Sequence, residues 1–338
     1  MTGLADPLEL TRALVSLETP TGSEGPATDL LGGALSRAGY RTVRQRVSPG
    51  RDNLLAFREP PAVVFSTHVD CVPPYIPLSE DEDAIRGRGS CDAKGLAAAM
   101  VAAAERLATA GERRIGLLFL VGEENGSDGA RAATALEPRG RFLVNGEPTE
   151  NRLSIGQKGS LRVDLHATGR AAHSAYPEEG QSAVTALLDT IERIRRMPLP
   201  RDPLLGASTL NVGLIRGGVA PNVLAPEASA QILIRTVEPT AALKSAIRAL
   251  MAPGVTAAFP VELPCHKGGR VPDGWDTTVV SYASDLPFLT SWGECFQLGP
   301  GTIRVAHTAE EHIRKADLLR GVELYARLAG DLLAREAS

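Results

Sequence analysis

Cysteine is scarce in this chain, which has only four cysteines among 338 residues and no Cys-x-x-Cys pair. A disulfide framework or a thiolate zinc site needs cysteines in characteristic numbers and spacings, and neither pattern is present. We therefore expect the cysteines to be buried small side chains of the interior. They are Cys71, Cys91, Cys265 and Cys295.

The chain also lacks a large excess of positive or negative charge. It has 36 basic and 40 acidic residues and a net charge of −4. A nucleic-acid-binding protein would carry a basic face, so this class is disfavoured. No apolar run approaches the ~20 residues that span a membrane. The first twenty residues lack the basic and apolar segments of a signal peptide, so we expect a cytoplasmic protein.

What is present is the composition of an ordinary globular protein, with 43% hydrophobic and 22% charged residues. The length is sufficient for two domains. Apolar, β-branched runs occur at residues 61–67, 113–121 and 140–145, with an alanine-rich, helix-favouring stretch at 94–111. This alternation predicts an α/β fold with a mainly parallel, twisted sheet and helices on both faces.

From about residue 160 the pattern changes to alternating apolar and polar residues, which is typical of strands with one exposed face. Strand-like and helix-like segments then follow in the order β-α-β-β-α, with a further strand near residues 254–258. This order predicts a compact α+β domain inserted into the first one. The predicted domains are residues 1–158 and 265–338 for the first and 159–264 for the insert.

Side chains that can bind metals follow the predicted strands of the first domain. In an open α/β sheet the carboxyl ends of the strands form one crevice, so we expect these side chains to converge there. The returning segment "VAHTAEEH" could complete the group with a second histidine. The residues are His68 and Asp70 after the first strand, Glu123 and Glu124 after the second, Glu147 after the third, Asp92 in the loop "GRGSCDAKG", and His307.

Imidazole and carboxylate groups without thiolates suit zinc, cobalt or manganese in a hydrolytic site. Two ions about 3.5–4 Å apart need a shared ligand, and Asp92 is the natural bridge because the glycines beside it allow close approach. One glutamate of the adjacent pair could bind metal while the other activates water. Simpler interpretations are that His68 is a core histidine, that the glutamates form a solvated loop pair, and that Asp92 caps the following helix.

Seven ordered motifs over residues 60–312 resemble one known family. It is the acetylornithine deacetylase, succinyl-diaminopimelate desuccinylase and glutamate carboxypeptidase family of dinuclear zinc metallohydrolases, which has a zinc-exopeptidase-like fold. The motifs are "STHVDCVPP", "GRGSCDAKG", "GEENGSDGA", "NGEPTE", "GRAAHSAYPEEGQSAV", "GGVAPNVLAPEASAQILIR" and "GPGTIRVAHTAEEH".

The resemblance implies a role for each residue of the group. One metal ion would be held by His68, Asp92 and Glu147. The second would be held by Asp92, Glu124 and His307, so that Asp92 bridges the two. Glu123 would be the general base, and Asp70 would orient His68 through its other ring nitrogen.

The resemblance also implies that the inserted domain is a lid and dimerisation domain. His173 would reach the active site of the partner subunit in a homodimer and stabilise the oxyanion. Asn222 and Arg235 would hold the substrate carboxylate or the tetrahedral intermediate. Alternatively, Asn222 only shapes the turn after Pro221, and Arg235 is a solvated strand residue. The remaining histidines, His166, His266 and His312, are expected at the surface or outside the ligand shell.

The resulting hypothesis is a metal-dependent amidohydrolase that releases an acyl group, most simply acetyl, from an N-acyl amino acid such as N-acetylornithine or N-acetyllysine. Two zinc ions would activate the water, and cobalt can substitute. Alternatives within the family are a desuccinylase, a hydrolase of lysine biosynthesis, and a dipeptidase or carboxypeptidase. A non-catalytic protein on the same fold is disfavoured because every site residue is present. A dinuclear phosphatase or nuclease is disfavoured by the charge.

Overall fold

The computed structural model of the protein describes residues 4 and 6–336. The chain divides into two compact units. Unit 2 comprises Gly156–His266 and the short segment Val280–Ala283, and unit 1 comprises the rest of the described chain.

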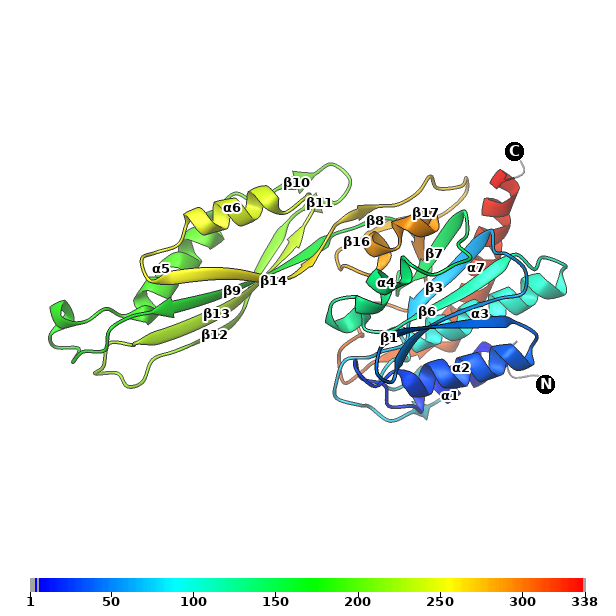
Figure 1. The fold of residues 1–338 in the computed structure, drawn as a ribbon, viewed down its shortest axis with the longest axis horizontal. Helices are drawn as coiled ribbons and strands as arrows, with labels where there is room; N and C mark the ends of the chain where they lie inside the picture. Colours follow the sequence, from blue (N-terminus) through cyan, green and yellow to red (C-terminus); the bar gives the residue numbers. More distant parts are fainter. Residues whose placement is uncertain (1–3, 5, 337–338) are drawn as a thin grey trace. The chain divides into compact units, whose positions relative to one another are not determined.

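Unit 1 is built on a nine-stranded sheet (Figure 1). Its four central strands, β6, β3, β7 and β17, run parallel to one another, whereas the flanking pairs β1–β2, β2–β6 and β17–β8 are antiparallel. The strands, in spatial order, are β1 (Arg41–Ser48), β2 (Arg51–Phe57), β6 (Ile115–Leu120), β3 (Val63–His68), β7 (Phe142–Gly146), β17 (Glu294–Leu298), β8 (Leu153–Gln157) and β15 (His266–Lys267), with β16 (Thr277–Val280) paired to β8.

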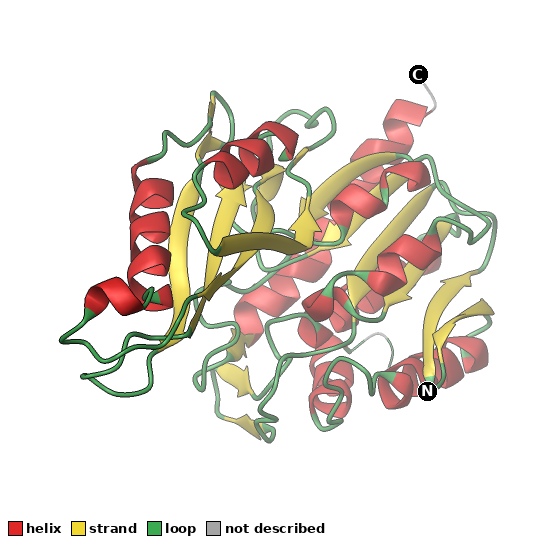
Figure 2. Ribbon diagram, turned by 60° about the vertical axis from the view of Figure 1, so that its left-hand side comes forward, coloured by secondary structure: helices red, strands yellow, loops and turns green. Residues whose placement is uncertain are grey.

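The central strands are buried on both faces. All residues of β3, β6 and β7 are buried, which is why these strands read as continuous apolar runs rather than alternating ones. The predicted α/β sheet with helices on both faces is confirmed. Figure 2, with helices in red and strands in yellow, shows helices alongside the strands of this sheet.

Two apolar cores lie on opposite faces of the sheet. On one face α3 packs against α1 and α7, and α2 packs on β1 and β2. On the other face α4, η3 and η4 contribute to a second core that includes Trp292. The helices are α1 (Pro7–Val15), α2 (Gly25–Arg37), α3 (Lys94–Thr109), α4 (Asp128–Ala133) and α7 (Lys315–Glu336), and the 3₁₀ turns are η1 (Glu123–Asn125), η3 (Leu286–Phe288) and η4 (Thr290–Trp292).

A small three-stranded sheet links two segments that are distant in sequence. It contains β4 (Ser79–Glu80), β5 (Ala84–Arg86) and β18 (His312–Arg314), in the order β18-β5-β4. The strand β5 ends directly before the "GRGSCDAKG" loop, and β18 begins at the last residue of the "VAHTAEEH" segment. Their pairing therefore brings the two predicted ligand segments side by side.

Unit 2 has a four-stranded antiparallel sheet in the order β12-β13-β9-β14, with α5 and α6 packed on one face. Burial along β13 alternates residue by residue, so the other face is open. Its elements are β9 (Gly159–Thr168), η2 (Pro177–Glu179), α5 (Ala183–Arg196), β10 (Arg201–Asp202), β11 (Gly206–Ala207), β12 (Thr209–Gly217), β13 (Glu227–Thr236), α6 (Ala241–Ala249) and β14 (Val255–Leu263).

Candidate metal centre and active site

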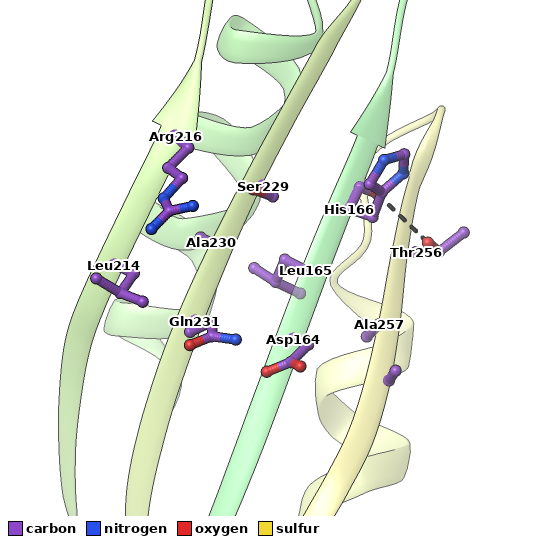
Figure 3. Close-up of a pocket in the computed structure, with 11 residues that line it drawn as sticks. Asp164, Leu165, His166, Leu214, Arg216, Ser229, Ala230, Gln231, Thr256 and Ala257 are labelled. Carbon is purple, nitrogen blue, oxygen red and sulfur yellow. Dashed lines mark hydrogen bonds between the residues drawn. The ribbon is translucent and has the colours of Figure 1, made fainter. Parts of the chain in front are cut away.

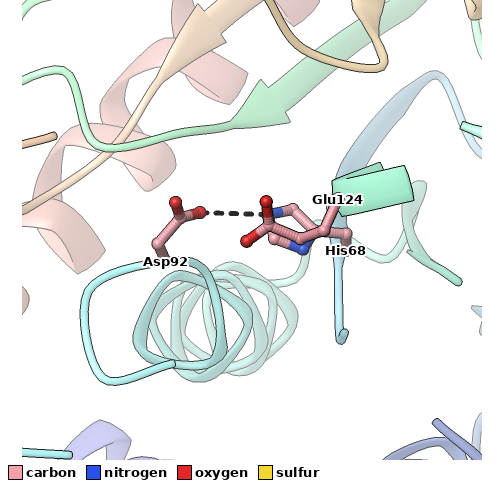
Figure 4. A group of neighbouring side chains, drawn as sticks. All are labelled: His68, Asp92 and Glu124. Atoms are coloured by element: carbon pink, nitrogen blue, oxygen red, sulfur yellow. Dashed lines mark hydrogen bonds and ion pairs between the residues drawn. The ribbon is translucent and has the colours of Figure 1, made fainter. Parts of the chain in front are cut away.

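His68 is the last residue of β3 and is 1% exposed. Its Nε2 lies 3.1 Å from Oδ1 of Asp92, and its Nδ1 lies 3.1 Å from the main-chain oxygen of Asp70. The Nδ1 atom is also 3.4 Å from Oδ1 of Asp70. The main-chain oxygen and Oδ1 of Asp70 thus flank Nδ1. The other ring nitrogen, Nε2, faces Asp92 (Figure 4).

Asp92 lies in a tight, glycine-rich loop directly before α3. Gly89 has φ +86°, and a Cβ there would lie 2.6 Å from Sγ of Cys71, so no larger residue fits. The N-cap residue of α3 is Ala93, without a side-chain cap. The alternative that Asp92 caps this helix is therefore wrong, and its carboxylate instead faces two histidines.

Burial disfavours ionisation of Asp92, but hydrogen bonds from His307 and His68 hold its pKa below the ordinary value. Nε2 of His307 lies 3.3 Å from Oδ2 of Asp92 and 3.0 Å from Oε1 of Glu124. These two carboxylates raise the pKa of His307 to about 10. His307 has φ +62°, a left-handed conformation that is costly for a non-glycine residue and is often retained at functional sites.

Glu123 and Glu124 begin the turn η1, two residues after the end of β6. The main-chain N–H groups of both residues donate to the Asp70 carboxylate, at 3.1 Å each, and the Thr21 hydroxyl donates to it at 2.7 Å. Asp70 thus holds the glutamate pair as well as His68. The left-handed Gly122, with φ +78°, makes the sharp turn out of the strand.

Glu147 follows β7 and is 4% exposed. Burial raises the pKa of Glu147 well above its ordinary value; the His68 charge opposes this rise and Asp92 adds to it. Burial likewise raises the pKa of Glu123, again opposed by His68 and reinforced by Glu147. Several acidic groups in one buried place would repel one another, and bound cations would relieve that repulsion.

The donor set fits a divalent metal. Ligand atoms of His68, Asp92 and Glu124 all lie within 4.8 Å of one another, and Nε2 of His307 contacts two of these residues. Imidazole and carboxylate donors without a thiolate match hydrolytic zinc or cobalt sites rather than structural zinc sites.

Residues 64–331 match the profile of the peptidase family M20/M25/M40. The chain belongs to this family. It is accordingly a hydrolase of amide or peptide bonds. A peptidase M20 domain-containing protein of Schizosaccharomyces pombe is 36% identical over 95% of this chain and 83% of its own length. A protein of Aspergillus fumigatus named "probable carboxypeptidase" is 34% identical over 98% of this chain and 88% of its own length.

Solved structures of peptidases share the fold. A tripeptidase from Staphylococcus aureus superposes with a TM-score of 0.78 at 21% identity, covering 97% of this chain and 99% of the other. The M20 family metallo-carboxypeptidase Sso-CP2 from Sulfolobus solfataricus gives a TM-score of 0.76 at 14% identity, covering 97% and 99%. Among the residues described, no helix has the length and apolarity that a membrane span requires.

The other predicted site residues, His173, Asn222 and Arg235, belong to unit 2. His173 is exposed, its Nδ1 accepts a hydrogen bond from the Ala175 N–H at 3.1 Å, and it forms a β-bridge with Val223. Asn222 is exposed, with its main-chain oxygen accepting from the Ser174 N–H at 2.9 Å, so the two segments are neighbours. The active-site roles of all three residues stay predictions.

The open face of the unit 2 sheet carries a groove of about 420 Å³. Figure 3 shows the side chains along it, which include Asp164, His166 and Arg216. His166 is exposed, as expected from its place on the polar side of the strand. Among the four cysteines, Cys71, Cys91 and Cys295 are buried and Cys265 is half-buried.

Sequence reasoning missed three polar residues that position the site. They are Thr21, which bonds Asp70, and the buried pair Arg88 and Glu311 beside the Asp92 loop. A signal existed for the last two, because both lie inside motifs that had been singled out for their ligands.

Proposed function

We propose that this protein is a metal-dependent exopeptidase of the carboxypeptidase or dipeptidase type, acting on small peptides with a free C-terminal carboxylate. The observation that carries the proposal is the convergence of His68, Asp92, Glu124 and His307 beside Glu123. The name of the Aspergillus fumigatus relative supports the carboxypeptidase reading. Deacylation of an N-acyl amino acid such as N-acetylornithine is the second candidate, favoured by the deacetylase-like motifs.

The proposed metal ligands are His68, Asp92 and Glu147 for one ion, and Asp92, Glu124 and His307 for the other. Two divalent ions, zinc in the simplest case or cobalt, would polarise the scissile carbonyl and lower the pKa of the attacking water toward neutrality. The contacts of Asp92 support a bridging role, since its two oxygens face different histidines.

Glu123 is the proposed general base. Burial raises its pKa, which favours a group that both takes a proton from water and returns it to the leaving amine near neutral pH. The Asp70 carboxylate accepts the main-chain N–H of Glu123, which fixes the backbone of the proposed base. Glu124 differs from its neighbour in contacting His307, which supports the division of roles within the pair.

Unit 2 is proposed to supply the oxyanion donor His173 to a partner subunit and to hold the substrate carboxylate with Asn222 and Arg235. Dimerisation through this unit is supported by the edge strand β12 and the loop after it, where Leu214, Ile215 and Val219 are 49%, 54% and 73% exposed. Apolar side chains on an exposed edge strand favour pairing with another chain.

The substrate class is tested with matched compounds in the presence of zinc or cobalt. The panel contains free dipeptides and tripeptides, N-blocked dipeptides, the same peptides with an amidated C-terminus, and N-acetyl and N-succinyl amino acids, with amine release as the readout. We expect turnover of peptides with a free carboxylate and its loss on amidation. Hydrolysis of acetyl amino acids alone would instead support the second candidate, the deacylase. Inactivity toward every amide with metal present would refute both candidates.

A further inference from the structure

A buried ion pair lies next to the candidate metal centre. Glu311 is 1% exposed and Arg88 is 3% exposed, and Nη1 of Arg88 donates to Oε2 of Glu311 at 2.5 Å. The two residues belong to the two loops that carry Asp92 and His307. Burying such a pair removes two charges from water and is by itself seldom a net gain in stability, so another role must be sought for it.

The Glu311 carboxylate holds the backbone of the Asp92 loop. Its second oxygen, Oε1, accepts main-chain N–H groups from three residues of that loop, the last being Asp92 itself. Hydrogen bonds to an ionised acceptor are stronger than those between neutral groups, so this oxygen fixes the loop more firmly than a neutral side chain would. The donors are Gly89 at 2.9 Å, Cys91 at 3.3 Å and Asp92 at 3.2 Å.

Arg88 connects the two loops in the opposite direction, from the Asp92 loop to the His307 segment. Its Nη1 also donates to the main-chain oxygen of Thr308, the residue after His307, at 3.2 Å, and its Nε donates to the main-chain oxygen of Pro74 at 3.2 Å. A side chain from the Asp92 loop thus holds the His307 segment, while a side chain from the His307 segment holds the Asp92 loop. The nearby β5–β18 pairing joins residues before the Asp92 loop to residues after His307, and the Gly87 N–H donates to the main-chain oxygen of Glu311 at 3.1 Å.

We propose that Glu311, paired with Arg88, is a positioning residue for the metal ion that Asp92, Glu124 and His307 would share. This inference rests on the proposed function. Glu311 contacts none of the reacting groups; it sets the distance between two ligands that come from segments far apart in the sequence. Residues that orient metal ligands typically influence metal affinity about 10–100-fold.

The test compares Glu311→Gln with Glu310→Gln, which removes the charge of the exposed neighbour. Metal-free proteins are titrated with Co²⁺, and bound cobalt is measured by equilibrium dialysis and by the visible absorption of the ion. In Glu311→Gln we expect one of the two equivalents to bind about 10–100-fold more weakly, with an altered spectrum. Glu310→Gln should bind as the wild type does. If Glu311→Gln bound both cobalt equivalents as tightly as Glu310→Gln does, the inference would be overturned.

If Glu311→Gln fails to fold because it leaves Arg88 unpaired, the double variant Arg88→Gln/Glu311→Gln removes that uncompensated charge. We expect the double variant to fold and still to bind one cobalt equivalent weakly. Wild-type cobalt affinity in it would refute the positioning role. A wild-type protein that binds no cobalt contradicts the proposed function itself, whereas normal binding by wild type and both glutamine variants contradicts only this inference.

Discussion

Strands β3 and β13 show how differently the two units use their side chains. Every residue of β3 is buried, so the candidate ligands of unit 1 lie at strand ends such as His68 and in loops such as that of Asp92. Along β13 buried and partly exposed residues alternate, so half of its side chains lie on the open face. A polar residue at a strand end of unit 1 therefore indicates function, whereas a polar residue on a strand of unit 2, such as Gln231, needs no special role.

The largest loss of activity is expected from removing the carboxylate that we propose to bridge the two ions. Asp92→Ala should lose both metal ions and turnover, by roughly 10³-fold or more, because metals supply several kcal/mol of transition-state stabilisation. Metal content by mass spectrometry and amine release are the measurements. Asp83→Ala removes an exposed aspartate of the same region and should leave both unchanged. Full metal content in Asp92→Ala would contradict the bridge.

The second prediction separates the adjacent glutamates. Glu123→Gln should reduce kcat by about 10²–10⁴-fold, the usual contribution of a general base, with metal content unchanged. Glu124→Gln should instead lose metal, because Glu124 contacts His307. Kinetics and metal analysis of both variants check this. The opposite result, with metal lost only in the Glu123 variant, would exchange the two roles.

The third prediction asks whether unit 2 contributes to the chemistry. His173→Ala should reduce turnover by about 10²–10³-fold, the typical cost of one oxyanion donor, while remaining fully metallated and dimeric. Mixing it with Glu123→Ala should restore part of the activity, because a mixed dimer has one site with both groups. Demonstrated subunit exchange without any recovered activity would rule out the action between subunits.

The smallest effect is expected from His166→Ala on the open face of the unit 2 sheet. Exposed substitutions usually change stability by no more than about 0.5 kcal/mol, so melting temperature and kcat/KM should stay close to wild type. This variant is the matched control for His173→Ala. A large loss of activity would show that the open face of this sheet contributes to activity.

Much of the candidate site could be predicted from the sequence because strand ends are easy to recognise. His68 and Glu124 follow apolar runs, and the parallel sheet brings such positions together without any knowledge of side-chain contacts. His307, whose segment is far away in the chain, was only a possible member of the group until the family resemblance assigned it to one metal ion. The metallohydrolase class followed from these residues, but the acetylornithine deacetylase reading went further than the comparisons support.

Other features could not be predicted because they depend on contacts between distant segments. The hydrogen bonds of Asp70 to the main chain of Glu123 and Glu124, and of Glu311 to the Asp92 loop, have no sequence pattern of their own. The helices α1 and α2 were also missed, although Asp6 caps α1 and Pro7 begins it. Nor did any pattern place Val280–Ala283 with unit 2.

The chain leaves unit 1 within β8 and returns to it within β15, and these two strands are neighbours in the sheet. The insert therefore begins and ends at almost the same place, and it interrupts neither the strand order nor the edge where the ligands gather. A change in the length or sequence of unit 2 therefore need not alter the strand order of the sheet that carries the candidate ligands.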